Sequence, residues 1–251
     1  MIQIKKYNFK NQNNNIVGSL ELENNKLYIY GDILMDSFFK CEETEDICPK
    51  DIVEFLKELE NSEEIEIHIN SGGGSVFGGL AIYNLLKQYK GKKVVYIDGL
   101  AGSIASVIAL AGDVVYIYEN SLFMIHNPLT TICGYYNVKD LQEQITALEN
   151  CKKAILTVYM ANINVENHIT EEEILSLMDN ETWLIGSEAT KYFNLNVLPV
   201  KNEIVAYTSS YFDKYKNTPK NIINTQDKGT KNILEQEKQQ ILNELEKICI
   251  I

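Results

Sequence analysis

The stretch from Gly99 to Pro128, GLAGSIASVIALAGDVVYIYENSLFMIHNP, places a serine and a histidine at the ends of two apolar segments. Ser103 stands in a turn of small residues, where a substrate could approach the backbone closely. His126 ends an apolar run and precedes Asn127 and Pro128, and proline ends a strand because it has no N–H to donate. The stretch therefore offers a nucleophile and a base at strand ends, where sites form in α/β sheets.

Two successive units on the amino-terminal side of His126 share one layout of strand, turn and helix. Residues 64–70 alternate isoleucine with polar side chains, which predicts a strand with one apolar face, and a glycine turn then leads into a helix over residues 76–89. Residues 92–98 form the next predicted strand, and an apolar helix over residues 104–111 follows Ser103. Two such units in succession predict an α/β fold with a mainly parallel sheet.

The rest of the chain divides into an arm, a main domain and a tail. We expect an arm or hairpin over residues 1–26, a main domain over 27–200, a polar linker over 201–231 and a helix with an apolar stripe over 232–251. Further predicted elements are strands at 27–33, 113–118, 122–125 and 195–200, and helices at 50–60, 137–161, 170–178 and 187–193. The helix over residues 137–161 is long and amphipathic, which is typical of a helix that docks on its own domain or on a partner subunit.

Composition excludes several classes of function. A net charge of −12 without a basic stripe argues against nucleic acid or an anionic membrane as a partner. The start of the chain is too polar for a secretion signal, and no apolar run reaches the ~20 residues of a membrane helix, so we expect a cytoplasmic protein. The five cysteines contain no CxxC pair, which favours reduced thiols over a disulfide framework or a zinc site.

The glycine turn Ser71–Ser75, SGGGS, does not match a nucleotide-binding loop. It lacks the spacing Gly-x-Gly-x-x-Gly and has no Gly-Lys-Ser/Thr ending. Its amides could instead face a developing negative charge as an oxyanion hole, and a glycine turn that only permits tight packing is the equally weighted alternative. Of the three histidines, His68 alternates with Glu66 on the polar face of a strand and His168 precedes a helix cap, so His126 is the candidate base.

Four motifs in order resemble the Clp protease proteolytic subunit family, and in particular its branch of phage and prophage head-maturation (prohead) proteases. The motifs are Ile69–Gly74 (INSGGG), Asp98–Ser106 (DGLAGSIAS), Met124–Pro128 (MIHNP), and Glu181–Leu184 (ETWL) with Ser187–Ala189 (SEA). The resemblance covers residues 27–200. It implies the ClpP/crotonase fold, a serine endopeptidase with a Ser-His-Asp type triad, and stacked homo-oligomeric rings, with the helix over residues 137–161 as the handle through which rings stack.

Carried over position by position, the resemblance implies Ser103 as nucleophile, His126 as base, and the amides of Gly74 and Ile104 as oxyanion donors. Ser106 lies one helical turn from Ser103, and the motif register favours Ser103. The acid is open: the family has an aspartate two residues before an aromatic, and this chain has Glu181 before Trp183, with Asp179 as the rival. Gly72 replaces the family's proline in the glycine turn, which should loosen that loop.

The implied reaction is hydrolysis of peptide bonds in protein or peptide substrates, and it requires no metal or other cofactor. The chain has no ATP site, so ATP dependence would come from a separate unfoldase, and phage capsid or scaffold proteins are the other candidate partners. Two alternatives remain at this stage. One is a crotonase-type enzyme that binds acyl-CoA, and the other is a catalytically inactive structural ring.

Overall fold

The computed structural model describes residues 4–10, 16–23, 25–40, 46–59, 62–200 and 214–219. The chain divides into two compact units, Met1–Asn217 and Thr218–Ile251, and the features below belong to the first. The predicted helix over residues 232–251 and most of the predicted linker lie outside the described residues. The predicted domain boundaries therefore stay predictions.

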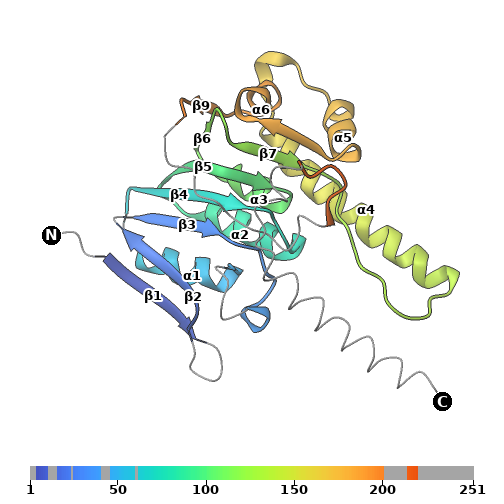
Figure 1. The fold of residues 1–251 in the computed structure, drawn as a ribbon, viewed down its shortest axis with the longest axis horizontal. Helices are drawn as coiled ribbons and strands as arrows, with labels where there is room; N and C mark the ends of the chain where they lie inside the picture. Colours follow the sequence, from blue (N-terminus) through green and yellow to red (C-terminus); the bar gives the residue numbers. More distant parts are fainter. Residues whose placement is uncertain are drawn as a thin grey trace. The chain divides into compact units, whose positions relative to one another are not determined.

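A mainly parallel sheet forms the centre of the first unit (Figure 1). Its parallel strands lie in the order β3 (Lys26–Tyr30), β4 (Glu64–Ser71), β5 (Lys92–Gly102), β6 (Val114–Tyr118) and β9 (Asn196–Leu198). A branch adds β7 (Leu122–Ile125), parallel to β5, and then β8 (Thr182–Ile185), antiparallel to β7. The predicted α/β fold with a mainly parallel sheet is thus confirmed.

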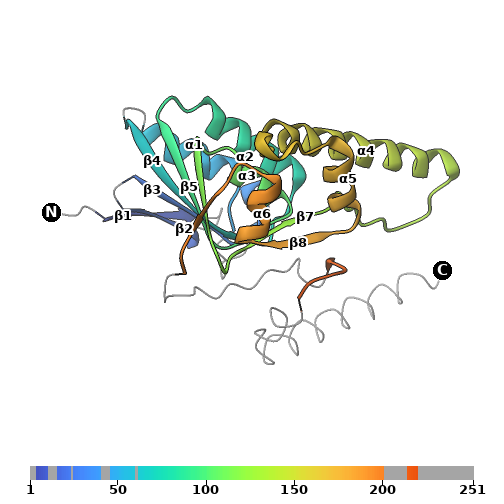
Figure 2. The same cartoon turned by 90° about the horizontal axis from the view of Figure 1, so that it is seen from above.

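The alternation in residues 64–70 determines which face of the sheet is buried. Ile65, Ile67 and Ile69 are fully buried in the main core, where helices pack against the strands. Figure 2 shows α1 (Pro49–Glu58) and α2 (Val76–Gln88) along the strands, and the short α3 (Ile104–Ala109) contacts α2. The remaining described elements are the hairpin of β1 (Ile4–Lys10) and β2 (Ile16–Glu23), the single turns η1 (Ser37–Phe39) and η2 (Val165–Asn167), α4 (Val138–Ala161), α5 (Glu171–Asp179) and α6 (Gly186–Tyr192).

Strand β5 is longer than the sequence predicted, since it continues past Asp98 to Gly102. The reason is a second pairing: Leu100, Ala101 and Gly102 pair with Leu122–Met124 of β7, beyond the part of β5 that pairs with β6. Strand β8 had no predicted counterpart, because only tertiary pairing with β7 makes it a strand. Together these pairings bring the turn after β5 next to the end of β7.

Helix α4 is packed over only part of its length. Its carboxyl-terminal half buries Ile155, Leu156, Val158 and Tyr159 in the core. Its amino-terminal half projects from the sheet (Figure 1), and Val138 there is 84% exposed. None of the helices in the described ranges is long and apolar enough to cross a membrane.

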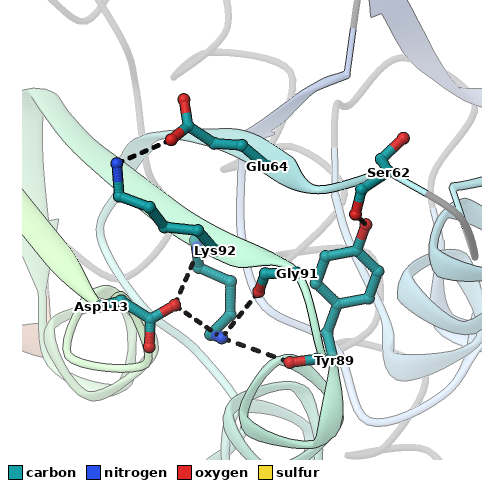
Figure 3. Close-up of polar contacts among 7 residues, drawn as sticks. Ser62, Glu64, Tyr89, Gly91, Lys92 and Asp113 are labelled. Carbon is teal, nitrogen blue, oxygen red and sulfur yellow. Dashed lines mark hydrogen bonds and ion pairs between the residues drawn. The ribbon is translucent and has the colours of Figure 1, made fainter.

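A polar network closes the amino-terminal ends of β4 and β5 (Figure 3). The buried Lys93 ammonium lies 2.8 Å from a carboxylate oxygen of Asp113 and donates to the carbonyl oxygens of Tyr89 and Gly91. The Tyr89 hydroxyl lies within hydrogen-bond distance of the carbonyl oxygens of Leu59 and Ser62, both at 2.8 Å. These contacts tie together the amino-terminal ends of β4 and β5. The predicted site lies at the opposite, carboxyl-terminal ends of the strands.

Candidate active site

Ser103 occupies a strained turn between β5 and α3. Its backbone has φ 53° and ψ −126°, a left-handed conformation that a residue with a Cβ rarely adopts. The Ser103 N–H donates to the Met124 carbonyl oxygen at 2.8 Å, which ties the turn to β7. A serine on a sharp strand-to-helix turn presents its hydroxyl away from the sheet, as a nucleophile must.

His126 follows β7 directly and its side chain meets Ser103. The Oγ of Ser103 and the Nε2 of His126 lie 2.7 Å apart, within hydrogen-bond distance. Burial lowers the pKa of His126 to about 4, although the negative charge of Glu181 acts in the opposite direction. The imidazole is therefore neutral at pH 7 and can accept the serine proton.

The two candidate acids lie in different environments. Glu181 is 7% exposed, is close enough to His126 to influence its pKa, and has φ 47°. The Asp179 side chain is 56% exposed and accepts hydrogen bonds from Lys152 at 2.6 Å and Asn127 at 2.8 Å. The hydrogen bonds from Lys152 and Asn127, and then the charge of Lys152, lower the pKa of Asp179. Burial and position favour Glu181 over Asp179 as the partner of His126.

Within the described part of the chain, no hydrogen bond joins Glu181 to His126. The carboxylate of Glu181 instead accepts from the backbone amides of Lys216 and Asn217, at 2.8 and 2.6 Å. The Nε1 of Trp183 also lies 3.5 Å from the same carboxylate. The acid is thus next to the base but is engaged by another segment of the chain.

The glycine turn packs directly against the serine. A Cβ built on Gly73 would lie 2.7 Å from the Ser103 Cβ and 3.3 Å from the Ile104 nitrogen, so a side chain has no room there. Gly73 and Gly74 both have positive φ, at 106° and 146°. Ile104 is the first residue of α3, and first-turn amides have no intrahelical acceptor. The predicted oxyanion donors Gly74 and Ile104 therefore lie on two segments that meet beside Ser103.

Ser106, the alternative nucleophile, is fully buried and already engaged. Its hydroxyl donates to the Ser103 carbonyl oxygen at 2.6 Å and lies 2.7 Å from the hydroxyl of Tyr159 on α4. Burial raises the pKa of the Tyr159 hydroxyl, although its hydrogen bond with Ser106 acts against this. These contacts tie helix α4 to the backbone of the turn that carries Ser103. Tyr159 could not be predicted from the sequence, because an amphipathic pattern does not distinguish a core tyrosine that contacts Ser106 from one that only fills the core.

Tyr215 is a second residue that the sequence analysis missed. It is buried, its ring lies 4.9 Å from the ring of His126, and its hydroxyl donates to the Gly72 carbonyl oxygen at 2.6 Å. It falls in a polar segment that the pattern assigned to a linker. No local signal marks such a residue, since only tertiary contact places it at the site.

The other two histidines are not at the site. His168 is exposed beside a helix cap. His68, on the polar face of β4, is half-buried: it is stacked between Tyr28 and Tyr96, and its Nδ1 lies 2.8 Å from a carboxylate oxygen of Asp98. Cys48 is buried and Cys133 is exposed. Across the described ranges, no group of three or more histidine, cysteine and acidic side chains is arranged to hold a metal ion.

Comparison with known proteins agrees with the fold. The family model described as Clp protease matches residues 21–193. The chain therefore belongs to the Clp protease family. This assignment is more specific than the α/β fold class, which follows from the sheet topology alone. A ClpP1 point mutant from Listeria monocytogenes has the same fold, with a TM-score of 0.56 and 24% identity over 71% of this chain and 92% of that one.

Two relatives named as ATP-dependent Clp protease proteolytic subunits illustrate the distance in sequence. The protein from Bacteroides thetaiotaomicron is 26% identical over 149 residues, and that from Porphyromonas gingivalis is 30% identical over 151 residues. Each match covers 59% of this chain and 65% of the relative's length. The chain thus matches slightly less than two thirds of these relatives.

Proposed function

We propose that this chain is a ClpP-like serine endopeptidase. The observation that carries the proposal is the 2.7 Å contact between the Ser103 hydroxyl and Nε2 of a buried, neutral His126. A neutral imidazole in this position can take the serine proton as attack begins. The crotonase-type alternative receives no support from this pair, because polarising a thioester requires neither a serine nucleophile nor its base.

The reaction begins with attack of the Ser103 oxygen on a peptide carbonyl carbon while His126 Nε2 takes the hydroxyl proton. The amides of Gly74 and Ile104 stabilise the resulting oxyanion. His126 then gives the proton to the leaving amine, and the C–N bond breaks to leave an acyl-enzyme. Water, deprotonated by His126, attacks the ester, and the serine oxygen leaves with the proton returned. Glu181 is the residue that would accept from Nδ1 of His126 and stabilise the imidazolium.

We also propose that the active form is a homo-oligomeric ring. The support is the amino-terminal half of α4, where Val138, Leu141 and Ile145 are exposed in the single chain. An apolar stripe of this kind favours a second copy as its cover. The relatives are named as ATP-dependent, and we propose that a separate ATPase supplies unfolded substrates to this chain.

The most specific part of the proposal is that the chain belongs to the head-maturation branch, and this part rests on the sequence motifs. It predicts a phage or prophage capsid or scaffold protein as the substrate. Incubation of the purified chain with capsid and scaffold proteins encoded near it tests this, with discrete cleavage as the expected result. Cleavage of unfolded model proteins only would point to general proteolysis.

The experiment that tests the catalytic proposal is labelling with a fluorophosphonate, which reacts with activated serines, after separation by size-exclusion chromatography. We expect label in a ring-sized fraction, loss of label in Ser103→Ala, and retained label in Ser187→Ala, a matched change at an exposed serine. Label that persists in Ser103→Ala would move the nucleophile elsewhere, with Ser106 as the first candidate. A ring without label would favour the structural alternative.

A further inference from the structure

The side chain of Tyr215 occupies a buried position between His126, Trp183 and Gly72 in the proposed active site, which we call the seat. Its ring meets the ring of His126 edge-on, with centroids 4.9 Å apart and an interplanar angle of 73°. On another side it meets Trp183, with centroids 6.1 Å apart and an angle of 69°. The geometry is that of favourable aromatic pairs, so the seat accepts an aromatic ring for reasons beyond apolar burial.

The far end of this seat is polar. The buried hydroxyl of Tyr215 donates to the Gly72 carbonyl oxygen at 2.6 Å. Gly72 belongs to the turn that packs against Ser103, and a buried carbonyl oxygen that loses its donor raises the free energy of the folded state. The seat therefore distinguishes a phenol from a phenyl ring. Phenylalanine would fill the ring position and leave Gly72 without its donor.

The backbone after Tyr215 contacts the candidate acid. The amides of Lys216 and Asn217 donate to the two carboxylate oxygens of Glu181, at 2.8 and 2.6 Å. The Asn217 side chain adds bonds to the carbonyl oxygens of Asn180 at 2.8 Å and Glu181 at 3.3 Å. Two adjacent amides that hold one carboxylate form a strong, charge-assisted pair of bonds. A peptide in extended or turning conformation can supply the same donors.

We propose that the active site contains a subsite for a tyrosine side chain of a peptide, and that Tyr215–Asn217 is its built-in occupant. The proposal rests on the serine peptidase function above and names a substrate class for it. Peptides with a tyrosine followed by two free backbone amides match the subsite. The chain's own segment, which lies beside β8 (red in Figure 1), competes with them.

The segment Tyr215–Asn217 also lowers the peptidase activity while it is bound in the subsite. Its ring covers one side of the catalytic imidazole, and its two amides engage the carboxylate oxygens that would accept from Nδ1 of His126. Because the segment is covalently attached, its effective concentration at the site is high, so a substrate must displace it. Release of the segment frees Glu181 for His126.

Binding to the subsite can be measured without catalysis, because Trp183 is the single tryptophan of the chain. In a Ser103→Ala, Tyr215→Ala double variant the seat is empty, and Trp183 emission should shift relative to Ser103→Ala. Titration with a synthetic peptide of residues 212–219 should reverse the shift. The same peptide with alanine in place of Tyr215 should bind about tenfold more weakly, and the phenylalanine version about fivefold more weakly.

Equal binding of the tyrosine and alanine peptides would overturn the subsite, whatever the chain's activity. The occupancy is tested in the chain with Ser103 intact, by the rate of fluorophosphonate labelling. Tyr215→Ala should label about tenfold faster than the parent, and Tyr211→Ala, which removes a tyrosine four positions earlier, should label at the parent rate. Equal rates in all three would overturn the built-in occupant and leave the peptidase intact. Absence of label in all three would refute the peptidase, and the binding titration would still decide the subsite.

Discussion

The two ends of the same parallel sheet are built in opposite ways. At the amino-terminal ends of β4 and β5, the buried Lys93 is matched by the Asp113 carboxylate and two carbonyl oxygens. At the carboxyl-terminal end, Ser103 and Glu181 hold positive φ angles beside two glycines that do the same. For a residue other than glycine, such as Ser103 or Glu181, a positive φ costs of order 1–3 kcal/mol and persists only where the surrounding structure holds it.

The comparison indicates that the charged groups at the amino-terminal ends of the strands stabilise the fold, whereas the groups at the carboxyl-terminal ends form the candidate site. Burial alone would raise the pKa of Asp113, but hydrogen bonds and charge from Lys93 outweigh it and lower the pKa. At the other end, burial lowers the pKa of His126 to about 4, and the negative charge of Glu181 offsets this only in part. The charges at the amino-terminal ends are stabilised by pairing, while burial at the carboxyl-terminal ends keeps the His126 imidazole uncharged at pH 7.

The largest change in activity is expected from substitution of the candidate acids, Glu181 and Asp179, at the carboxyl-terminal ends of the strands. Glu181→Gln should lower kcat/KM for a peptide substrate about 10³-fold, because the imidazolium loses its counter-charge. Asp179→Asn is the matched control, and it should stay within about threefold of the parent. A larger loss in Asp179→Asn than in Glu181→Gln would reverse the assignment of the acid.

The pH dependence of stability should carry the signature of His126. Between pH 6.5 and about 4 the unfolded chain binds a proton there that the folded chain does not, so acidification favours unfolding. The free energy of unfolding should fall with decreasing pH in this window, by up to about 3 kcal/mol. Urea denaturation across the pH range measures it. The fall should shrink in His126→Gln, and an unchanged slope in that variant would assign it to other groups.

At the amino-terminal end, Asp113→Ala should lower the free energy of unfolding by about 2–3 kcal/mol, since it leaves the buried Lys93 ammonium without its counter-charge. Labelling of Ser103 per folded molecule should not change. Thermal denaturation and labelling on one preparation test both. A loss of labelling with unchanged stability would show that the two ends are not separate in function.

The smallest effect is expected for Lys92, the neighbour of Lys93 on the other face of the sheet. Its ammonium meets Glu64 at 2.7 Å, but both side chains are about half exposed. Exposed ion pairs contribute little, so Lys92→Met should leave the urea concentration at the midpoint of unfolding nearly unchanged. Lys93→Met, measured in the same denaturation series, should have a clearly larger effect. Equal effects would contradict the importance of burial.

Local pattern was sufficient for the sheet and for most helices. Alternation in residues 64–70 identified β4 and its buried face, and the helix predicted over residues 170–178 corresponds to α5, which Thr170 and Glu173 cap. The end of β5 and the whole of β8 were not predictable, because both exist through pairing with β7. Pairing between segments that are distant in the sequence, such as β7 and β8 about 60 residues apart, has no local signature.

The same division holds at the candidate site. The sequence by itself determined the α/β fold, the turn that carries Ser103, and the histidine that ends a buried strand, because periodicity and turn chemistry act over a few neighbouring residues. Only the tertiary structure decided that Ser103 and His126 meet at 2.7 Å, that Glu181 rather than Asp179 is buried beside them, and that Tyr215 covers the imidazole. These contacts depend on long-range packing, which is specified by the whole core and not by any one motif.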